Sequence, residues 1–316
     1  MKKLTTKKLS VAPKPNRFVI VVYSDTHIND AMGLLAPEIG MSWGGSYTAN
    51  VPQAQWTWPK WLEFCELAKS IAARKPNTKF IAVGDGDLGE LDLKRRSINV
   101  LSRNPNDILH MMTTTLSPLT SVVDRNYVIR GTEAHGGLSN WIEELFAGKI
   151  GAEPLKLTEA INKKDADGKE EPSNLQYARW DMLFDWGGVL VDISHHMRIA
   201  GREWSVGSPA VTVCKESIIT YTEGGMRVPN LIVRAHVHHN YDSFEASPIC
   251  RVVTTVGWQI GETRGLAIPY LKRIDPVFRP RPIGGIILEI DDKEYKVHKF
   301  ISMPPQRIPE SWSENT

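Results

Sequence analysis

The chain has 316 residues, of which 41% are hydrophobic and 23% are charged, a composition typical of a folded globular protein that excludes wholesale disorder. Its 38 basic and 36 acidic side chains give a formal net charge of +2, which by itself does not indicate a nucleic-acid-binding protein. The three cysteines are odd in number and have no Cys-x-x-Cys spacing, which argues against a disulfide framework and against a thiolate zinc site. This cysteine content suits a reducing compartment, and we expect a cytoplasmic protein.

Strands are predicted by short apolar, β-branched runs that recur along the chain and mostly end in a polar cluster. They follow a basic leader, residues 1–17, which we expect to be flexible and which lacks the apolar stretch of a signal peptide. None of the runs approaches the roughly 20 apolar residues of a membrane span. The predicted strands cover residues 18–23, 80–83, 127–129, 189–193, 231–233, 252–256, 286–290 and 295–301.

Helices are predicted between the early strands. The patterns cover residues 58–74, with a proline near the first turn, residues 139–146, with an N-cap residue, and, more weakly, residues 93–101 and 106–115. The polar segment 151–174 predicts a surface excursion, and residues 302–316 form a Pro-rich tail. Strand–helix alternation followed by a strand-rich half predicts one layered α/β domain over residues 18–301.

Histidines and acids gather just past the ends of the predicted strands, where seven of the nine histidines lie. In an extended segment, residues two apart point the same way, so Asp25 with His27, and His236 with His238, each offer two ligands to one side. Neutral imidazole with carboxylate is a ligand set of Mn, Fe, Co, Ni or Zn. The pattern therefore predicts a transition-metal site at the strand ends.

The order of these groups resembles the motifs of the calcineurin-like metallophosphoesterases. Those motifs read Asp-x-His, Gly-Asp, Gly-Asn-His-Asp/Glu, His and Gly-His-x-His, each after a strand. The corresponding stretches here are Asp25-x-His27, Gly84-Asp85, the Gly131 cluster with His135, then His195, then His236-x-His238. The resemblance spans residues 18–300 and implies a metallophosphoesterase-type layered β-sandwich flanked by helices.

The resemblance also implies the roles of individual residues around two divalent transition-metal ions. Manganese is the first choice, with Fe, Zn, Ni, Co or Mg as alternatives. The first ion would be held by Asp25, His27 and His238, and the second ion by His195 and His236. Asp85 would bridge the two ions. His135 would be the catalytic residue that assists the leaving group. Asp87, His196 and His239 would lie behind or beside the site.

The activity implied in this way is hydrolysis of phosphate esters, phosphodiesters foremost, by a hydroxide that bridges the two ions. Nucleotide, nucleic-acid and phosphoprotein substrates all remain open, and no membrane partner is expected. One motif departs from the family, because Gly131-Thr132-Glu133-Ala134-His135 stands where Gly-Asn-His is usual. Either Thr132 takes the place of the asparagine ligand or Glu133 supplies a carboxylate oxygen instead.

This departure supports an alternative, a catalytically impaired member of the fold that serves as an interaction or nucleic-acid-binding module. The tryptophan-rich segment 43–61 is also relevant to this alternative. It contains Trp43, Trp56, Trp58 and Trp61. Exposed tryptophans there would stack on bases, whereas buried ones would pack a cap or a subunit contact, and we favour packing.

Overall fold

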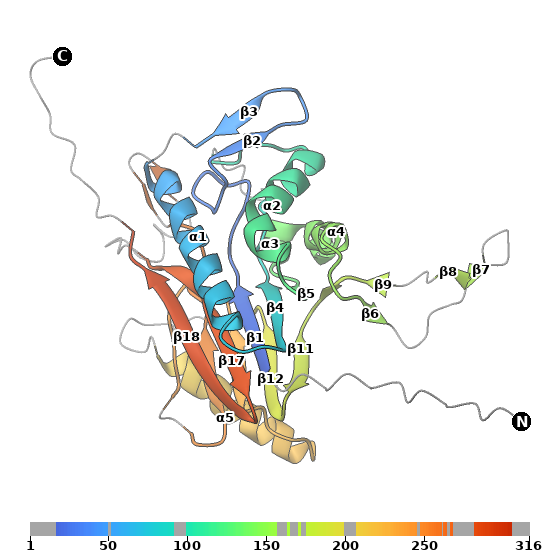
Figure 1. The fold of residues 1–316 in the computed structure, drawn as a ribbon, viewed down its shortest axis with the longest axis vertical. Helices are drawn as coiled ribbons and strands as arrows, with labels where there is room; N and C mark the ends of the chain where they lie inside the picture. The colour runs from blue at the N-terminus through green and yellow to red at the C-terminus, as the bar shows by residue number, and fades with distance from the viewer. Residues whose placement is uncertain are drawn as a thin grey trace, which may run out of the picture.

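The structure is a computed structural model that describes residues 17–49, 52–91, 99–156, 163–164, 170–171, 175–198, 207–244, 247–260, 262–263, 266–267 and 281–304. Two β-sheets pack face to face, and helices cover their outer faces (Figure 1). The predicted layered α/β sandwich is therefore confirmed. Most of the basic leader, much of the polar excursion and most of the tail lie outside the described residues.

The first sheet has the strand order β10-β5-β4-β1-β17-β18. Its strands β10, β5, β4 and β1 are parallel neighbours, and β17 and β18 are antiparallel. In chain order the bounds are β1 (Arg17–Tyr23), β4 (Thr78–Asp85), β5 (Arg125–Ile129), β10 (Ala178–Arg179), β17 (Ile283–Asp291) and β18 (Glu294–Ser302).

The second sheet has the order β11-β12-β13-β14, in which β12, β13 and β14 are parallel and β11 is antiparallel. Its strands are β11 (Met182–Trp186), β12 (Val189–Ser194), β13 (Leu231–Arg234) and β14 (Arg251–Thr254). Short strands make two-stranded pairs, which are β2 (Glu38–Gly40) with β3 (Ser46–Thr48), β6 (Leu155–Lys156) with β9 (Leu175–Gln176), β7 (Lys163–Lys164) with β8 (Glu170–Glu171), and β15 (Glu262–Thr263) with β16 (Leu266–Ala267).

Alternating side chains of the buried strands serve two cores. In β1, Ile20 and Val22 point between the two sheets, whereas Val19 and Val21 point to the helices on the other face. Those helices are α1 (Pro52–Ala72), α2 (Pro105–Thr120) and α4 (Trp141–Lys149), and α5 (Ser208–Glu223) covers the second sheet. Two short turns, α3 (Glu133–Gly136) and η1 (Leu138–Asn140), precede α4. No helix in the described part of the chain is long and apolar enough to cross a membrane.

All eight predicted strands are present, while the predicted helix limits need correction. The helix expected over 58–74 begins at Pro52, so Pro59 lies inside it on an exposed position. The helix expected over 139–146 begins at Trp141, because Ser139 has a positive φ of 56° and belongs to the preceding turn. The pattern at 106–115 lies within α2, and most of the pattern at 93–101 lies outside the described residues.

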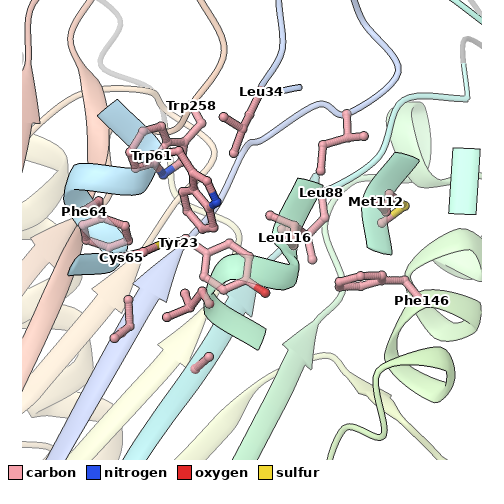
Figure 2. Close-up of a cluster of buried hydrophobic side chains, with 14 of the residues drawn as sticks. Tyr23, Leu34, Trp61, Phe64, Cys65, Leu88, Met112, Leu116, Phe146 and Trp258 are labelled. Carbon is pink, nitrogen blue, oxygen red and sulfur yellow. The ribbon is translucent and has the colours of Figure 1, made fainter. Parts of the chain in front are cut away.

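Three of the four tryptophans of segment 43–61 pack, as we favoured, but against the core of the domain itself and not in the cap or subunit contact that we expected. Trp61 on α1 is fully buried (Figure 2). Trp56 and Trp58 lie partly buried against the same cluster. Trp43, next to the turn between β2 and β3, is 70% exposed. Only Trp43 of these four therefore presents most of its ring to solvent.

Trp61 is expected to contribute strongly to stability, because its ring centroid lies 5.1 Å from that of Trp258 and 5.5 Å from that of Tyr23. Trp61→Ala should lower the free energy of unfolding by roughly 3–5 kcal/mol, the usual loss for a buried aromatic side chain. Trp43→Ala, the exposed control, should change it by less than about 0.5 kcal/mol. Denaturant unfolding of both variants measures this, and equal losses would contradict the burial described here.

Candidate metal centre

The loops that follow five strands meet at one edge of the two sheets. β1, β4 and β5 are parallel in the first sheet, and β12 and β13 are parallel in the second, so carboxyl ends lie together within each sheet. The backbone N–H of Asp25 donates to the Gly86 carbonyl at 2.9 Å. Nδ1 of His195 donates to the Asp85 carbonyl at 2.6 Å and so connects the two sheets. Residues far apart in the sequence thereby converge.

The first cluster of possible ligands consists of Asp25, His27 and His238, and one ligand atom of each lies within 4.8 Å of the others. Nε2 of His238 lies 3.3 Å from Oδ1 of Asp25, and the rings of His27 and His238 stack at 5.5 Å. Asp25 and His27 are buried, and His238 is only partly exposed. These are the three residues that the sequence assigned to a first ion.

The second cluster consists of Asp25, Asp87, His195 and His236, again with ligand atoms within 4.8 Å of one another. Nε2 of His195 lies 3.0 Å from Oδ2 of Asp87, and Nδ1 of His236 lies 3.8 Å from the same oxygen. His195 and His236 were expected together. Asp25 belongs to both clusters, so it is the carboxylate that the two share.

Asp85, the expected bridge, is absent from the clusters found among the described residues, and Asp87 is present in its place. The β1–β4 register explains the difference, because Tyr23 lies opposite Gly84 and Asp85 is still within its strand. In this strand the side chain of Asp85 is on the same face of the sheet as that of Val83, two residues earlier, which points between the two sheets. Neither carboxylate oxygen of Asp85 makes a hydrogen bond among the described residues, and burial raises its pKa to about 7. Among the described residues, Asp87 of the second Gly-Asp pair thus takes the place in the second cluster that was expected for Asp85, and which carboxylate bridges two ions stays a prediction.

A third cluster, which the sequence reasoning missed in part, joins Glu90 to His27 and His135. Oε2 of Glu90 lies 2.5 Å from Nδ1 of His135 and 3.4 Å from Nδ1 of His27. Burial alone would raise the pKa of Glu90, but hydrogen bonds from these two histidines outweigh burial and lower it to about 2. The sequence did contain one indication of Glu90, because it is a further acid three residues after Asp87 in the same loop. His135 is therefore held at the edge of the first cluster by a carboxylate.

The altered motif after β5 contacts the second cluster through Thr132. Its backbone N–H and its hydroxyl donate to Oδ1 of Asp87 at 2.6 and 3.0 Å. Glu133 is exposed and accepts a hydrogen bond from the backbone N–H of Ser139. Of the two alternatives for completing the second site, Thr132 is the one that lies beside it.

Two further residues hold this loop close to Asp87, namely Gly131 of the altered motif and Glu143, which the motif order did not indicate. A Cβ added to Gly131 would lie 2.2 Å from Oδ1 of Asp87, so the close approach requires glycine. The buried carboxylate of Glu143 on α4 accepts hydrogen bonds from the backbone N–H groups of Gly131 at 2.7 Å and Leu88 at 3.1 Å. Glu143 thereby joins the loops after β4 and β5.

The backbone at the clusters is not extended, contrary to the geometry assumed from the sequence. Five cluster residues have a positive φ, an uncommon conformation for any residue other than glycine. They are Asp25 (48°), His27 (41°), Asp87 (51°), His236 (71°) and His238 (51°). His236 and His238 belong to different clusters, whereas Asp25 and His27 share one. Backbone strain concentrated in this way is typical of functional sites.

The charges of the second cluster favour an added positive charge. Burial alone would lower the pKa of His195, but the carboxylates of Asp87, Asp25 and Asp85 outweigh it and raise that pKa well above its usual range. Burial alone would raise the pKa of Asp87, but His195 and His135 hold it well below its usual range. Either a proton on His195 or a bound cation supplies the charge that these carboxylates require.

Buried ligand atoms without a hydrogen bond fit a bound cation. Among the described residues, Asp25 Oδ1, His27 Nε2 and His195 Nε2 are such atoms, and so are both carboxylate oxygens of Asp85, which lies outside the clusters. Because Nδ1 of His195 donates to a carbonyl, its neutral ring presents a lone pair at Nε2, beside the carboxylate of Asp87. This set of imidazole nitrogens and carboxylate oxygens suits a divalent transition metal. His196 and His239 lie outside the clusters found among the described residues.

Comparisons with known proteins add little to this geometry. No family model matches the chain, and no curated protein matches its sequence. Vps29 from Chaetomium thermophilum is 10% identical over 92% of this chain and 97% of that one, with a TM-score of 0.36. The sulfate thiohydrolase SoxB from Thermus thermophilus is 10% identical over 92% of this chain and 57% of that one, with a TM-score of 0.37. An archaeal phosphodiesterase is 10% identical over 89% of this chain and 99% of that one, with a TM-score of 0.35. Similarity at this level carries no weight for the function.

Proposed function

We propose that the chain is a metal-dependent hydrolase of phosphate esters, a calcineurin-like metallophosphoesterase that acts foremost on phosphodiesters. The observation that carries the proposal is the pair of adjoining clusters that share Asp25 and contain buried ligand atoms without a hydrogen bond among the described residues. Their residues come from the strand ends that the motif order indicated, apart from the exchange of Asp85 for Asp87. The resemblance in the sequence and the chemistry of the donor set thus support the same class of reaction.

Two divalent ions, manganese first, would supply the Lewis acidity and the nucleophile that two-metal hydrolases use. In this proposal the first ion is held by His27 and His238, and the second ion by Asp87, His195 and His236. The carboxylate of Asp25 is shared by the two ions. The chain itself orients these ligands. The Asp85 carbonyl fixes the tautomer of His195, and Thr132 holds the carboxylate of Asp87.

His135 would act on the leaving group. Its Nδ1 is held by the ionised carboxylate of Glu90, and its side chain is partly exposed at 16%. A histidine oriented in this way can give a proton to a departing alkoxide or steady its charge. This role leaves His135 beside the ions rather than among their ligands.

Hydrolysis assays with controlled metal content test the proposal. The substrates are bis(p-nitrophenyl) phosphate and p-nitrophenyl phosphate, assayed with added manganese and with chelator, alongside elemental analysis of the purified protein. We expect manganese-dependent, chelator-sensitive turnover with about two ions per chain, and faster turnover of the diester. No turnover with at most one ion would overturn the proposal and favour the non-catalytic interaction module.

A further inference from the structure

A cavity of about 570 Å³ lies on the α5 side of the second sheet, away from the core between the sheets. Its walls come from β12, β13, α5 and the chain just after β12. The side chains of Asp192 and Arg234 line it, whereas their neighbours Ile193 and Val233 point between the two sheets. Cavities of this size are typical of sites for small organic ligands.

The cavity adjoins the candidate metal centre at His196. This residue lines the cavity and follows His195 directly, and its ring centroid lies 5.4 Å from that of His195 and 5.8 Å from that of His236. The same two strands, β12 and β13, lead into the histidines of the second cluster and supply Asp192 and Arg234. A substrate at the second cluster therefore has a neighbouring space into which its organic part can extend.

The charged groups in the cavity are paired, so they do not select an anion. Nη1 of Arg234 donates to Oδ1 of Asp192 at 2.8 Å, and Nη1 of Arg198 donates to Oε1 of Glu216 at 3.1 Å. The Tyr221 hydroxyl donates to Oδ2 of Asp192 at 3.3 Å. Burial, followed by the charge of Asp192, raises the pKa of Tyr221 to about 12, so it remains a neutral hydroxyl.

The rest of the lining consists of hydroxyl groups, from Ser194 on β12 and from Ser217 and Thr220 on α5, and of the apolar side chains of Met197 and Val213. A cavity with balanced charges and several hydroxyls can both donate and accept hydrogen bonds. Such a lining matches an uncharged group that carries hydroxyls of its own beside an apolar face, and it offers little to a second phosphate.

We propose that this cavity binds the neutral, hydroxyl-bearing organic group of the phosphate ester, a nucleoside or a sugar, while the phosphate lies at the second cluster. The inference rests on the proposed function, and it makes the α5 cavity the determinant of which ester is preferred. It also predicts that the free organic group binds without any hydrolysis.

Filling the cavity tests this inference by its effect on substrate preference. Thr220→Trp places a large ring in the cavity, and Ser217→Trp does so from the next turn of α5. Thr222→Trp is the matched control, because Thr222 is exposed on the same helix and does not line the cavity. All three are compared for thermal unfolding first, so that a misfolded variant is recognised.

The two substrates are thymidine 5′-(p-nitrophenyl phosphate) and methyl p-nitrophenyl phosphate, which share a leaving group and differ in the retained organic group. We expect the ratio of their kcat/KM values, nucleoside ester over methyl ester, to fall about tenfold in both filled variants, a change of about 1.4 kcal/mol. The ratio should be unchanged in Thr222→Trp. An unchanged ratio in both filled variants would overturn the inference.

Direct binding separates this inference from the proposed function. Thymidine and methyl ribofuranoside are titrated into the wild type and the three variants and followed by ligand-observed NMR. Binding of thymidine alone supports a nucleoside site, and binding of both supports a site that recognises the sugar. Either result in a protein without turnover supports the cavity while the proposed function fails. Turnover without binding of either compound, and without a change of the ratio, overturns the inference alone.

Discussion

Replacing Asp87 with Asn is expected to abolish hydrolysis and to release an ion, whereas Asp85→Asn should leave both largely intact. The carboxylate of Asp87 lies 3.0 Å from Nε2 of His195 in the second cluster, and Asn removes its charge while keeping its shape. Loss of groups that merely orient metal ligands already reduces affinity or activity 10- to 100-fold, so we expect a loss of more than about a hundredfold here. Turnover of bis(p-nitrophenyl) phosphate and elemental analysis measure both effects.

Asp85→Asn is the matched control, because it makes the same change two residues earlier in the chain. Among the described residues the Asp85 carboxylate makes no hydrogen bond, and burial raises its pKa to about 7, so a neutral amide resembles its protonated form. We expect activity to fall by less than about tenfold, or about 1.4 kcal/mol of transition-state stabilisation. The reverse result, with Asp85→Asn inactive and Asp87→Asn active, would restore Asp85 as the bridge.

The strands were predictable from the sequence because each carries apolar or β-branched side chains that pack against a core cluster. A strand such as Val189–Ser194 must be apolar on the side between the sheets, and its neighbours need β-branched residues that fit a pleated surface. The edge strand Met182–Trp186 escaped prediction, since it contains no β-branched residue and Asp185 interrupts its apolar run. Helix α5 escaped for another reason. Its valines, threonines and isoleucines have low helix propensity, and packing of Ala210 and Cys214 on the second sheet stabilises the helix instead.

The candidate site was predictable as a set of strand ends but not in its detail. Motif order identified Asp25, His27 and His238 because each directly follows a strand, and parallel strands end at the same edge. The choice between Asp85 and Asp87 depended on the register of β1 against β4, which the sequence alone does not contain. The positive φ angles of the cluster residues were hidden for the same reason, because they result from hydrogen bonds between loops. Glu90 was missed because its partners, His27 and His135, come from other loops.

His135→Ala is expected to lower turnover by roughly 10²- to 10⁴-fold, the range for loss of a general acid, while metal content stays near that of the wild type. The expectation follows from the position of His135, whose Nδ1 is held by Glu90 at the edge of the first cluster. Leu138→Ala is the matched control, since Leu138 lies three residues further along the same loop and is 78% exposed. It should change neither turnover nor metal content.

The leaving group sharpens the test of His135. A nitrophenolate needs little help to depart, so the loss should be larger for a diester with an alkyl alcohol as the leaving group than for a nitrophenyl ester. Glu90→Gln should show the same preference with a smaller loss, because it keeps His135 and removes only the carboxylate that orients it. If His135→Ala instead loses an ion, then His27, Glu90 and His135 form a metal site of their own. His135 would then act as a ligand, and the proton for the leaving group would have to come from another residue or from water.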